Sequence, residues 1–259
     1  MAVPSLLAGT ADPDSSAACG MVSNPPMNQG TTTIDRASGQ LATLYSGGGA
    51  SDAAWTSAGK FGPGIELDAA QSQYVETQLT APQPVPLTVE AWVKGSANLA
   101  TGEAGIVNKY ASSSLEGFQI FAKGQRLSAW YYTHTTNARF EGGPLLNDDL
   151  WHHCAAVWDE SGLQVFMDGE RVGTAGWTNG VGLSVETTPL RIGTYPSYGG
   201  APGSFFDGSI DEVALYGRAL TWDEIRARFL DGPPTVPEPA TLALLGLGLG
   251  VLAHRRRRI

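Results

Sequence analysis

Leu87-Thr88-Val89-Glu90-Ala91-Trp92-Val93-Lys94 is the stretch that decides the fold of this chain. Its odd-numbered positions are all aliphatic, whereas its even-numbered positions carry Thr, Glu, Trp and Lys. Successive side chains of an extended chain point to opposite faces, so a period of two separates one apolar face from a second, mixed face. The stretch therefore predicts a β-strand that lays one face on a hydrophobic core.

Short segments of the same kind lie on both sides of this strand. We expect strands at 41–45, 74–77, 106–110, 118–123, 127–132, 151–158, 163–167, 171–174, 190–193 and 209–216. Asp168-Gly169 joins two of them and is a type I′ hairpin signal. Many short strands separated by turns predict an all-β fold, an antiparallel sandwich of two sheets.

One short helix is predicted on the C-terminal side, over residues 221–230. Thr221-Trp222-Asp223-Glu224 is a capping box, with Thr221 as the N-cap and Glu224 three residues later. Gly232 is expected to end the helix, and residues 232–236 form a short linker. At the other end of the chain, residues 1–33 lack periodicity and predict an irregular N-terminal segment.

Charge narrows the classes of function. Four of the 16 basic residues lie at 255–258, so residues 1–239 carry 12 basic and 25 acidic side chains, a net charge of −13. Such an acidic domain repels nucleic acid and anionic lipid, so we expect no nucleic-acid partner. Of the two cysteines, Cys154 lies in an apolar strand and is expected to be a small buried hydrophobe, while a disulfide with Cys19 stays open.

The C-terminal residues have a different composition from the rest. Pro237, Glu238 and Pro239 precede a stretch without charge at 240–253, and Arg255, Arg256, Arg257 and Arg258 follow it. As a helix the apolar stretch is about 21 Å long, shorter than the roughly 20 residues that a full span prefers. The arginines act as a membrane stop on the cytoplasmic side, which places the domain outside. A buried helix with a basic end and an ordinary tail anchor are the alternatives.

This order of segments closely resembles the PEP-CTERM sorting signal of Gram-negative bacteria. The resemblance assigns residues 237–259 to the signal and implies an exosortase-type processing enzyme as a partner. It also implies export to the cell surface or extracellular matrix, with transient anchoring in the inner membrane through a transmembrane-type helix. Met1 to Gly9 lack a basic residue, so a signal peptide is expected upstream of them.

Residues 34–231 resemble the LamG-like, concanavalin A-like jelly-roll family. The resemblance rests on an ordered set of segments: 35–39, 59–62, 74–75, 88–93, 150–153, 165–169 and 206–220. It implies two curved antiparallel sheets packed face to face. Members of this family often hold one structural calcium ion, and here Asp35 and Asp211 are the expected carboxylate ligands, with carbonyls near Lys60 or Phe61. The alternative is that Asp35 caps its own turn and that Asp211 faces solvent or pairs with an arginine.

Aromatic residues are the candidates for ligand binding. Trp130 and Tyr132 lie on one predicted strand, and Tyr195 and Tyr198 lie in a loop rich in Gly and Pro. Aromatic rings stack on sugars, and rim loops often carry binding residues. Core packing is the alternative for part of this set.

No catalytic constellation is evident. Adjacent acids such as Asp211-Glu212 and Asp148-Asp149 point to opposite faces of a strand and do not make the facing pair that glycoside hydrolysis needs. The rings of His152 and His153 diverge for the same reason. We therefore expect an exported, non-enzymatic surface or matrix protein that binds glycan or protein. The alternatives are a purely structural matrix component without a ligand and a glycoside hydrolase.

Overall fold

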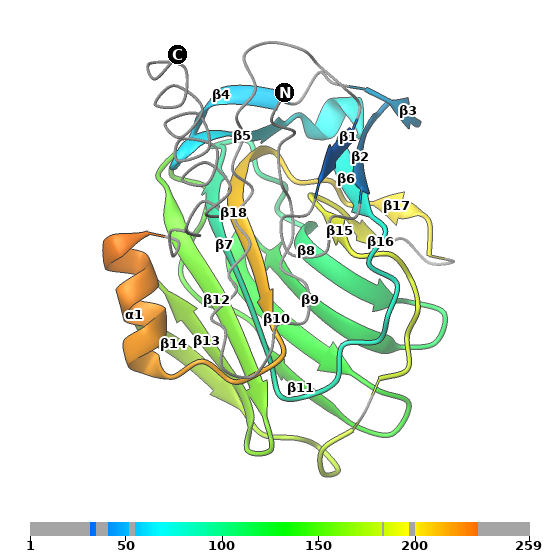
Figure 1. The fold of residues 1–259 in the computed structure, drawn as a ribbon, viewed down its shortest axis with the longest axis vertical. Helices are drawn as coiled ribbons and strands as arrows, with labels where there is room; N and C mark the ends of the chain where they lie inside the picture. The colour runs from blue at the N-terminus through cyan, green and yellow to red at the C-terminus, as the bar shows by residue number, and fades with distance from the viewer. Residues whose placement is uncertain (1–31, 35–40, 52–54, 183, 197–199, 233–259) are drawn as a thin grey trace, which may run out of the picture.

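The computed structural model describes residues 32–34, 41–51, 55–182, 184–196 and 200–232. Within these ranges the chain forms two large antiparallel sheets that pack face to face, a two-stranded ribbon and one α-helix (Figure 1). This arrangement confirms the all-β sandwich predicted from the sequence.

The first sheet has nine strands. In spatial order they are β1 (Thr32–Ile34), β2 (Leu41–Ser46), β6 (Tyr74–Thr77), β15 (Arg191–Ile192), β8 (Glu103–Ala111), β9 (Glu116–Lys123), β10 (Arg126–Tyr132) and β11 (Asn137–Phe140), with β3 (Gly49–Ala50) paired to β2. A short 3₁₀ helix, η1 (Ala69–Gln71), precedes β6.

The second sheet has seven strands. In spatial order they are β14 (Glu170–Ala175), β13 (Gly162–Met167), β12 (His152–Asp159), β7 (Leu87–Gly95), β18 (Gly208–Tyr216), β5 (Gly62–Leu67) and β4 (Trp55–Gly59). The separate ribbon pairs β16 (Tyr195–Pro196) with β17 (Pro202–Gly203). Asp168 and Gly169, between β13 and β14, have φ angles of 54° and 79°, as the predicted hairpin turn requires.

β7 is a central strand of the seven-stranded sheet and confirms the predicted alternation. Its four aliphatic side chains are at most 1% exposed and lie in the core between the two sheets. Its mixed face is buried too: Glu90 is 4% exposed and Trp92 is 3% exposed. The outer surface of this sheet is therefore covered around β7.

The helix α1 (Trp222–Asp231) supplies part of that cover (Figure 1). Glu224 N donates to Thr221 Oγ1 at 3.3 Å, and Thr221 N donates to the Glu224 carboxylate at 2.8 Å, so the predicted capping box is confirmed. Ile225 is buried in a small apolar cluster on the outer face of the sheet. The other buried members of this cluster are Ala155, Val157, Phe166, Ala214, Tyr216 and Leu220.

A buried polar network also joins α1 to β7. The Glu90 carboxylate accepts a hydrogen bond from Tyr216 Oη at 2.8 Å. It also lies 3.3 Å from His153 Nε2 and 3.5 Å from Arg228 Nε. A buried carboxylate needs such partners because it has lost its hydration. The network therefore fixes the helix, from which the C-terminal residues continue, to the middle of the sheet.

Lys109 closes one end of the sandwich. Its side chain is on β8 and the residue is 1% exposed. Nζ donates to the carbonyl oxygens of Thr188 at 2.6 Å, Thr80 at 3.0 Å and Glu186 at 3.1 Å. Burial lowers the pKa of Lys109 to about 8, with Glu186 acting in the opposite sense. One ammonium group thus joins the connection after β6 to the connection after β14.

Two further expectations concern the core and the tail. Cys154 is 0% exposed, and burial raises the pKa of its thiol, as expected for a small core residue. Among the residues that the structure describes, no helix is both long enough and apolar enough to cross a membrane. The expected apolar helix at 240–253 and the arginines at 255–258 lie outside those residues, as does Cys19.

Candidate functional site

Aromatic side chains gather on the outer face of the nine-stranded sheet. On β10 the odd-numbered residues from 127 to 131 belong to the core, so Trp130 and Tyr132 lie on the opposite side. Their ring centroids are 5.6 Å apart, and the ring of Tyr195 on β16 lies 6.4 Å from Trp130. Three of the four predicted ligand-binding residues are thus brought together, while Tyr198 lies outside the described residues.

Gly105 on β8 allows the ribbon to approach the sheet. A Cβ built at this position would lie 2.0 Å from the backbone carbonyl of Thr194, so no larger residue fits without moving the chain. The close approach places the ring of Tyr195 at 5.6 Å from Phe121, which is itself 4.6 Å from Trp130. A glycine far away in the sequence therefore helps to position a candidate binding residue.

Phe121 and Tyr110 complete this group, and sequence reasoning missed both. The Tyr110 ring lies 5.9 Å from Tyr132, across the neighbouring strands β8, β9 and β10. Both residues occupy outward-facing positions in the alternating pattern of their own strands, and this was the available signal. The sequence does not show which strands pair, so it could not bring the two residues to Trp130 and Tyr132. We call Tyr110, Phe121, Trp130, Tyr132 and Tyr195 the aromatic face.

Charged side chains surround the aromatic face. Lys123 Nζ lies 5.3 Å and the Arg139 guanidinium 5.7 Å from the Trp130 ring. Arg139 Nη1 donates to Tyr132 Oη at 3.1 Å. Trp130 is 8% exposed, whereas Tyr132 and Tyr195 are half-buried. The two tyrosines therefore form the accessible part of the face, and Trp130 supports them from below.

Asp211, an expected calcium ligand, is fully buried. Its Oδ2 accepts from Phe61 N at 3.1 Å and its Oδ1 accepts from Glu212 N at 2.9 Å. Burial raises the pKa of Asp211 to about 6, and the backbone N–H groups that it accepts from oppose this rise. The alternative that Asp211 faces solvent is wrong, because the carboxylate holds the β4–β5 turn against β18.

Calcium binding stays a prediction. Backbone hydrogen bonds from Phe61, Glu212 and Lys60 use three of the roughly four acceptor positions of the Asp211 carboxylate. The groups of Phe61 and Glu212 that reach it are N–H donors, which satisfy a carboxylate without a metal. Asp35, the other expected ligand, lies outside the described residues.

The two adjacent histidines point apart, as predicted. His152 Nδ1 lies 2.7 Å from Asp168 Oδ2, and its Nε2 lies 3.1 Å from Asp148 Oδ2. The Asp168 hydrogen bond is the largest influence that raises the pKa of His152, and Asp148 adds to it against the effect of burial. His153 instead faces Glu90 beneath α1. Each ring has its own carboxylate partners on a different side of β12.

The two packed antiparallel sheets, with aromatic side chains on one outer face, define a β-sandwich protein. A family model for the concanavalin A-like lectin/glucanases superfamily matches residues 68–226, and a model for the PEP-CTERM protein-sorting motif matches residues 235–258. The chain belongs to the concanavalin A-like lectin/glucanase superfamily and carries a PEP-CTERM sorting motif. The motif indicates export to the cell envelope of a Gram-negative bacterium and processing by an exosortase-type system.

Solved structures share the fold at low sequence identity. Domain 4 of AbnA, a GH43 extracellular arabinanase from Geobacillus stearothermophilus in complex with arabinotriose, is 19% identical, with a TM-score of 0.52 over 74% of this chain and 88% of that chain. The binding domain of Paraclostridial Mosquitocidal Protein 1 is 11% identical, with a TM-score of 0.58 over 82% and 51%. The botulinum neurotoxin serotype G binding domain is 13% identical, with a TM-score of 0.54 over 76% and 48%.

These likenesses show the fold alone. This chain spans about half the length of the two toxin domains. No match is found among curated proteins.

Proposed function

We propose that this protein is an exported, non-enzymatic component of the cell surface or extracellular matrix that binds carbohydrate through the aromatic face. The observation that carries the proposal is the meeting of Tyr132 and Tyr195 around Trp130. Half-buried tyrosines offer ring faces for stacking on sugars and hydroxyls for hydrogen bonds. Burial raises the pKa of Tyr195, and its hydroxyl hydrogen-bonds Glu103 and Gln119, which holds the ring in place.

A comparison guides the choice of the first glycan probes. Domain 4 of AbnA was solved in complex with arabinotriose, and it covers 74% of this chain. At 19% identity the likeness shows the fold alone, so it serves here only to choose arabino-oligosaccharides among the first probes.

In this proposal, the C-terminal residues 237–259 direct the protein to the cell surface. Residues 240–253 insert as a short apolar helix in the inner membrane, Arg255 to Arg258 stop transfer on the cytoplasmic side, and Pro237-Glu238-Pro239 mark the segment for processing. The anchor is transient because the apolar stretch is shorter than a comfortable span. Deletion of 237–259 should alter both processing and retention at the envelope.

A structural calcium ion is the second part of the proposal. Asp35 and Asp211 would hold it near the β4–β5 turn, where it would stabilise the sandwich and take no part in chemistry.

Removal of one half-buried ring tests the binding proposal. A glycan array that includes arabino-oligosaccharides identifies the probe, and its affinity is then measured for the full chain and for Tyr132→Ala. We expect at least about fivefold weaker binding, since loss of a stacking contact is worth on the order of 1 kcal/mol or more. Trp222→Ala is the matched control, because Trp222 is 47% exposed on α1.

The alternatives give different outcomes. Absence of binding to every glycan would favour a purely structural matrix component. Release of reducing sugar by the wild-type chain would overturn the non-enzymatic assignment and favour a glycoside hydrolase.

A further inference from the structure

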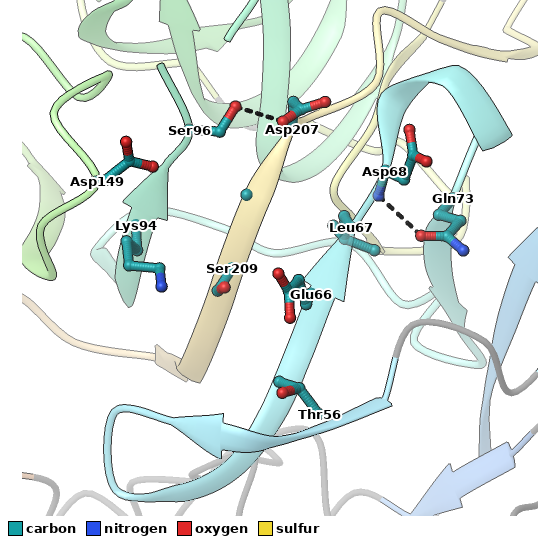
Figure 2. A pocket seen from close by; sticks show the side chains of 11 residues that line it. Thr56, Glu66, Leu67, Asp68, Gln73, Lys94, Ser96, Asp149, Asp207 and Ser209 are labelled. Atoms are coloured by element: carbon teal, nitrogen blue, oxygen red, sulfur yellow. Dashed lines mark hydrogen bonds between the residues drawn. The ribbon is translucent and has the colours of Figure 1, made fainter. Parts of the chain in front are cut away.

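A second hollow lies on the other side of the sandwich, on the outer face of the seven-stranded sheet. It has a volume of about 470 Å³ and lies between β5, β18 and the end of β7 (Figure 2). Its charged lining consists of four carboxylates and one ammonium group. These belong to Glu66, Asp68, Asp149, Asp207 and Lys94. We call this hollow the acidic cleft.

The floor of the acidic cleft is a row of three polar side chains on adjacent strands. Ser209 on β18 pairs with Glu66 on β5 and with Lys94 on β7. Neighbouring strands lie about 4.8 Å apart, so a carboxylate, a hydroxyl and an ammonium group follow one another across the sheet. Among the described residues, neither Glu66 nor Lys94 takes part in an ion pair.

Ser209 is the residue that points to a ligand. It lines the cleft and is only 2% exposed. Its hydroxyl has no hydrogen-bond partner in the part of the chain that the structure describes. The hydroxyl opens onto the hollow and is therefore free to hydrogen-bond a molecule that binds there.

The wall beside Ser209 is rigid. Gly208 has a φ of 137°, and a Cβ there would lie 2.1 Å from the carbonyl oxygen of Lys94, so only glycine lets β18 approach β7 this closely. Ser96 N donates to the carbonyl oxygen of Asp207 at 3.0 Å, and the Ser96 hydroxyl hydrogen-bonds the Asp207 carboxylate. These contacts hold Asp207 at the rim, next to the row on the floor.

The chemistry of the lining selects the kind of ligand. No three metal-binding side chains converge among the described residues, so the carboxylates are spread around the rim and do not form a compact metal site. Ser209 and Lys94 can donate to sugar oxygens, and the carboxylates can accept from hydroxyl or amine groups. Four carboxylates against one ammonium repel acidic sugars and attract a positively charged group.

We propose that the acidic cleft binds a short saccharide that carries a free amine. The amine pairs with Glu66, which lies beside Ser209 on the floor of the cleft, and the sugar oxygens accept from Ser209 and Lys94. No aromatic ring lines the cleft, so hydrogen bonds and charge supply the affinity, and binding weakens as salt rises. The site is independent of the aromatic face, which lies on the outer side of the other sheet.

The test compares two forms of one sugar. A β-1,4-linked glucosamine tetrasaccharide and its fully N-acetylated form are titrated calorimetrically into the full chain at mildly acidic pH and low salt. We expect the free-amine form to bind at least about tenfold more tightly. Ser209→Ala and Glu66→Gln should each weaken it several-fold, whereas Glu160→Gln, at an exposed turn, should leave it unchanged.

Three outcomes would overturn the proposal. These are equal affinity for the two forms, failure of the free-amine form to bind, and binding that is indifferent to both cleft variants. Weakening by Tyr132→Ala in place of Ser209→Ala would move the binding to the aromatic face and also refute the cleft. If only the aromatic face fails to bind glycan, the calorimetric result for the acidic cleft is unaffected. The proposed function and the cleft proposal can therefore be refuted separately.

Discussion

His152 is held between two carboxylates at the start of β12, and its protonation should affect stability. A histidine whose pKa is raised in the folded state stabilises the fold fully below its ordinary value of 6.5 and loses that contribution as the pH rises through the folded value. Asp148, whose pKa is lowered by hydrogen bonds from Leu150 N and His152 in spite of burial, keeps its charge in the same range.

We therefore expect His152→Gln to lower the melting temperature most near pH 5 to 6 and least near pH 8. A charge-assisted hydrogen bond is worth on the order of 1–2 kcal/mol, which is a shift of roughly 2–8 °C in a domain of this size. Thermal melts from pH 5 to 8 measure it. His134→Gln, at an exposed position, is the control, and a shift that does not depend on pH would contradict the assignment.

Single residues were the hardest part to predict. The parity of β10 indicates that Trp130 and Tyr132 share a face, but only the strand register brings Phe121 and Tyr110 to them. The same holds for Ser209, which meets Glu66 and Lys94 through two different pairings. Register depends on long-range packing, which one sequence without its partners does not display.

The helix α1 was predictable because its signals are local. Its N-cap, its capping box and its terminal glycine all lie within the helix and its flanking residues. Arg218 also donates to Glu224 at 2.6 Å, and this contact is the largest influence that lowers the pKa of Glu224 to about 2. The strands were predicted for the same kind of reason, from alternation within each segment. The burial of Glu90 was missed because α1 comes from far along the chain.

We expect Thr221→Ala to destabilise the domain by about 1 kcal/mol, because the N–H of Glu224 loses its side-chain acceptor. The melting temperature should fall by roughly 2–4 °C. Thr101→Ala, at an exposed loop position, is the matched control. An unchanged melting temperature for Thr221→Ala would mean that packing of Ile225 and Arg228, and not the cap, holds the helix.

Calcium binding would affect the stability of the whole molecule, because its two expected ligands come from distant parts of the chain. Asp211 joins β18 to the β4–β5 turn, and Asp35 lies before β2. If the ion binds, saturating calcium should raise the melting temperature relative to EDTA, since a ligand at 100 times its Kd adds about 2.7 kcal/mol. Asp211→Asn should abolish this difference, while Glu160→Gln should keep it. Identical melts in calcium and EDTA for the wild-type chain would refute the ion.

The aromatic face and the acidic cleft lie on the outer sides of different sheets and therefore face opposite directions. A sandwich with two such sites can hold two polymer strands at once, which would make one small domain a cross-link. Either single variant, Tyr132→Ala or Ser209→Ala, should keep binding and lose bridging, because one site remains, whereas the double variant should lose both.

The three hydrogen bonds of Lys109 have a consequence for a protein that is exported from the cell. Three carbonyl oxygens around one positive charge make a small coordination shell whose ion is part of the chain. The junction that Lys109 makes between the two connections therefore needs no dissolved metal ion, and a chelator cannot remove its positive charge. Where divalent ions are scarce or are captured by the surrounding polymer, this end of the sandwich stays closed.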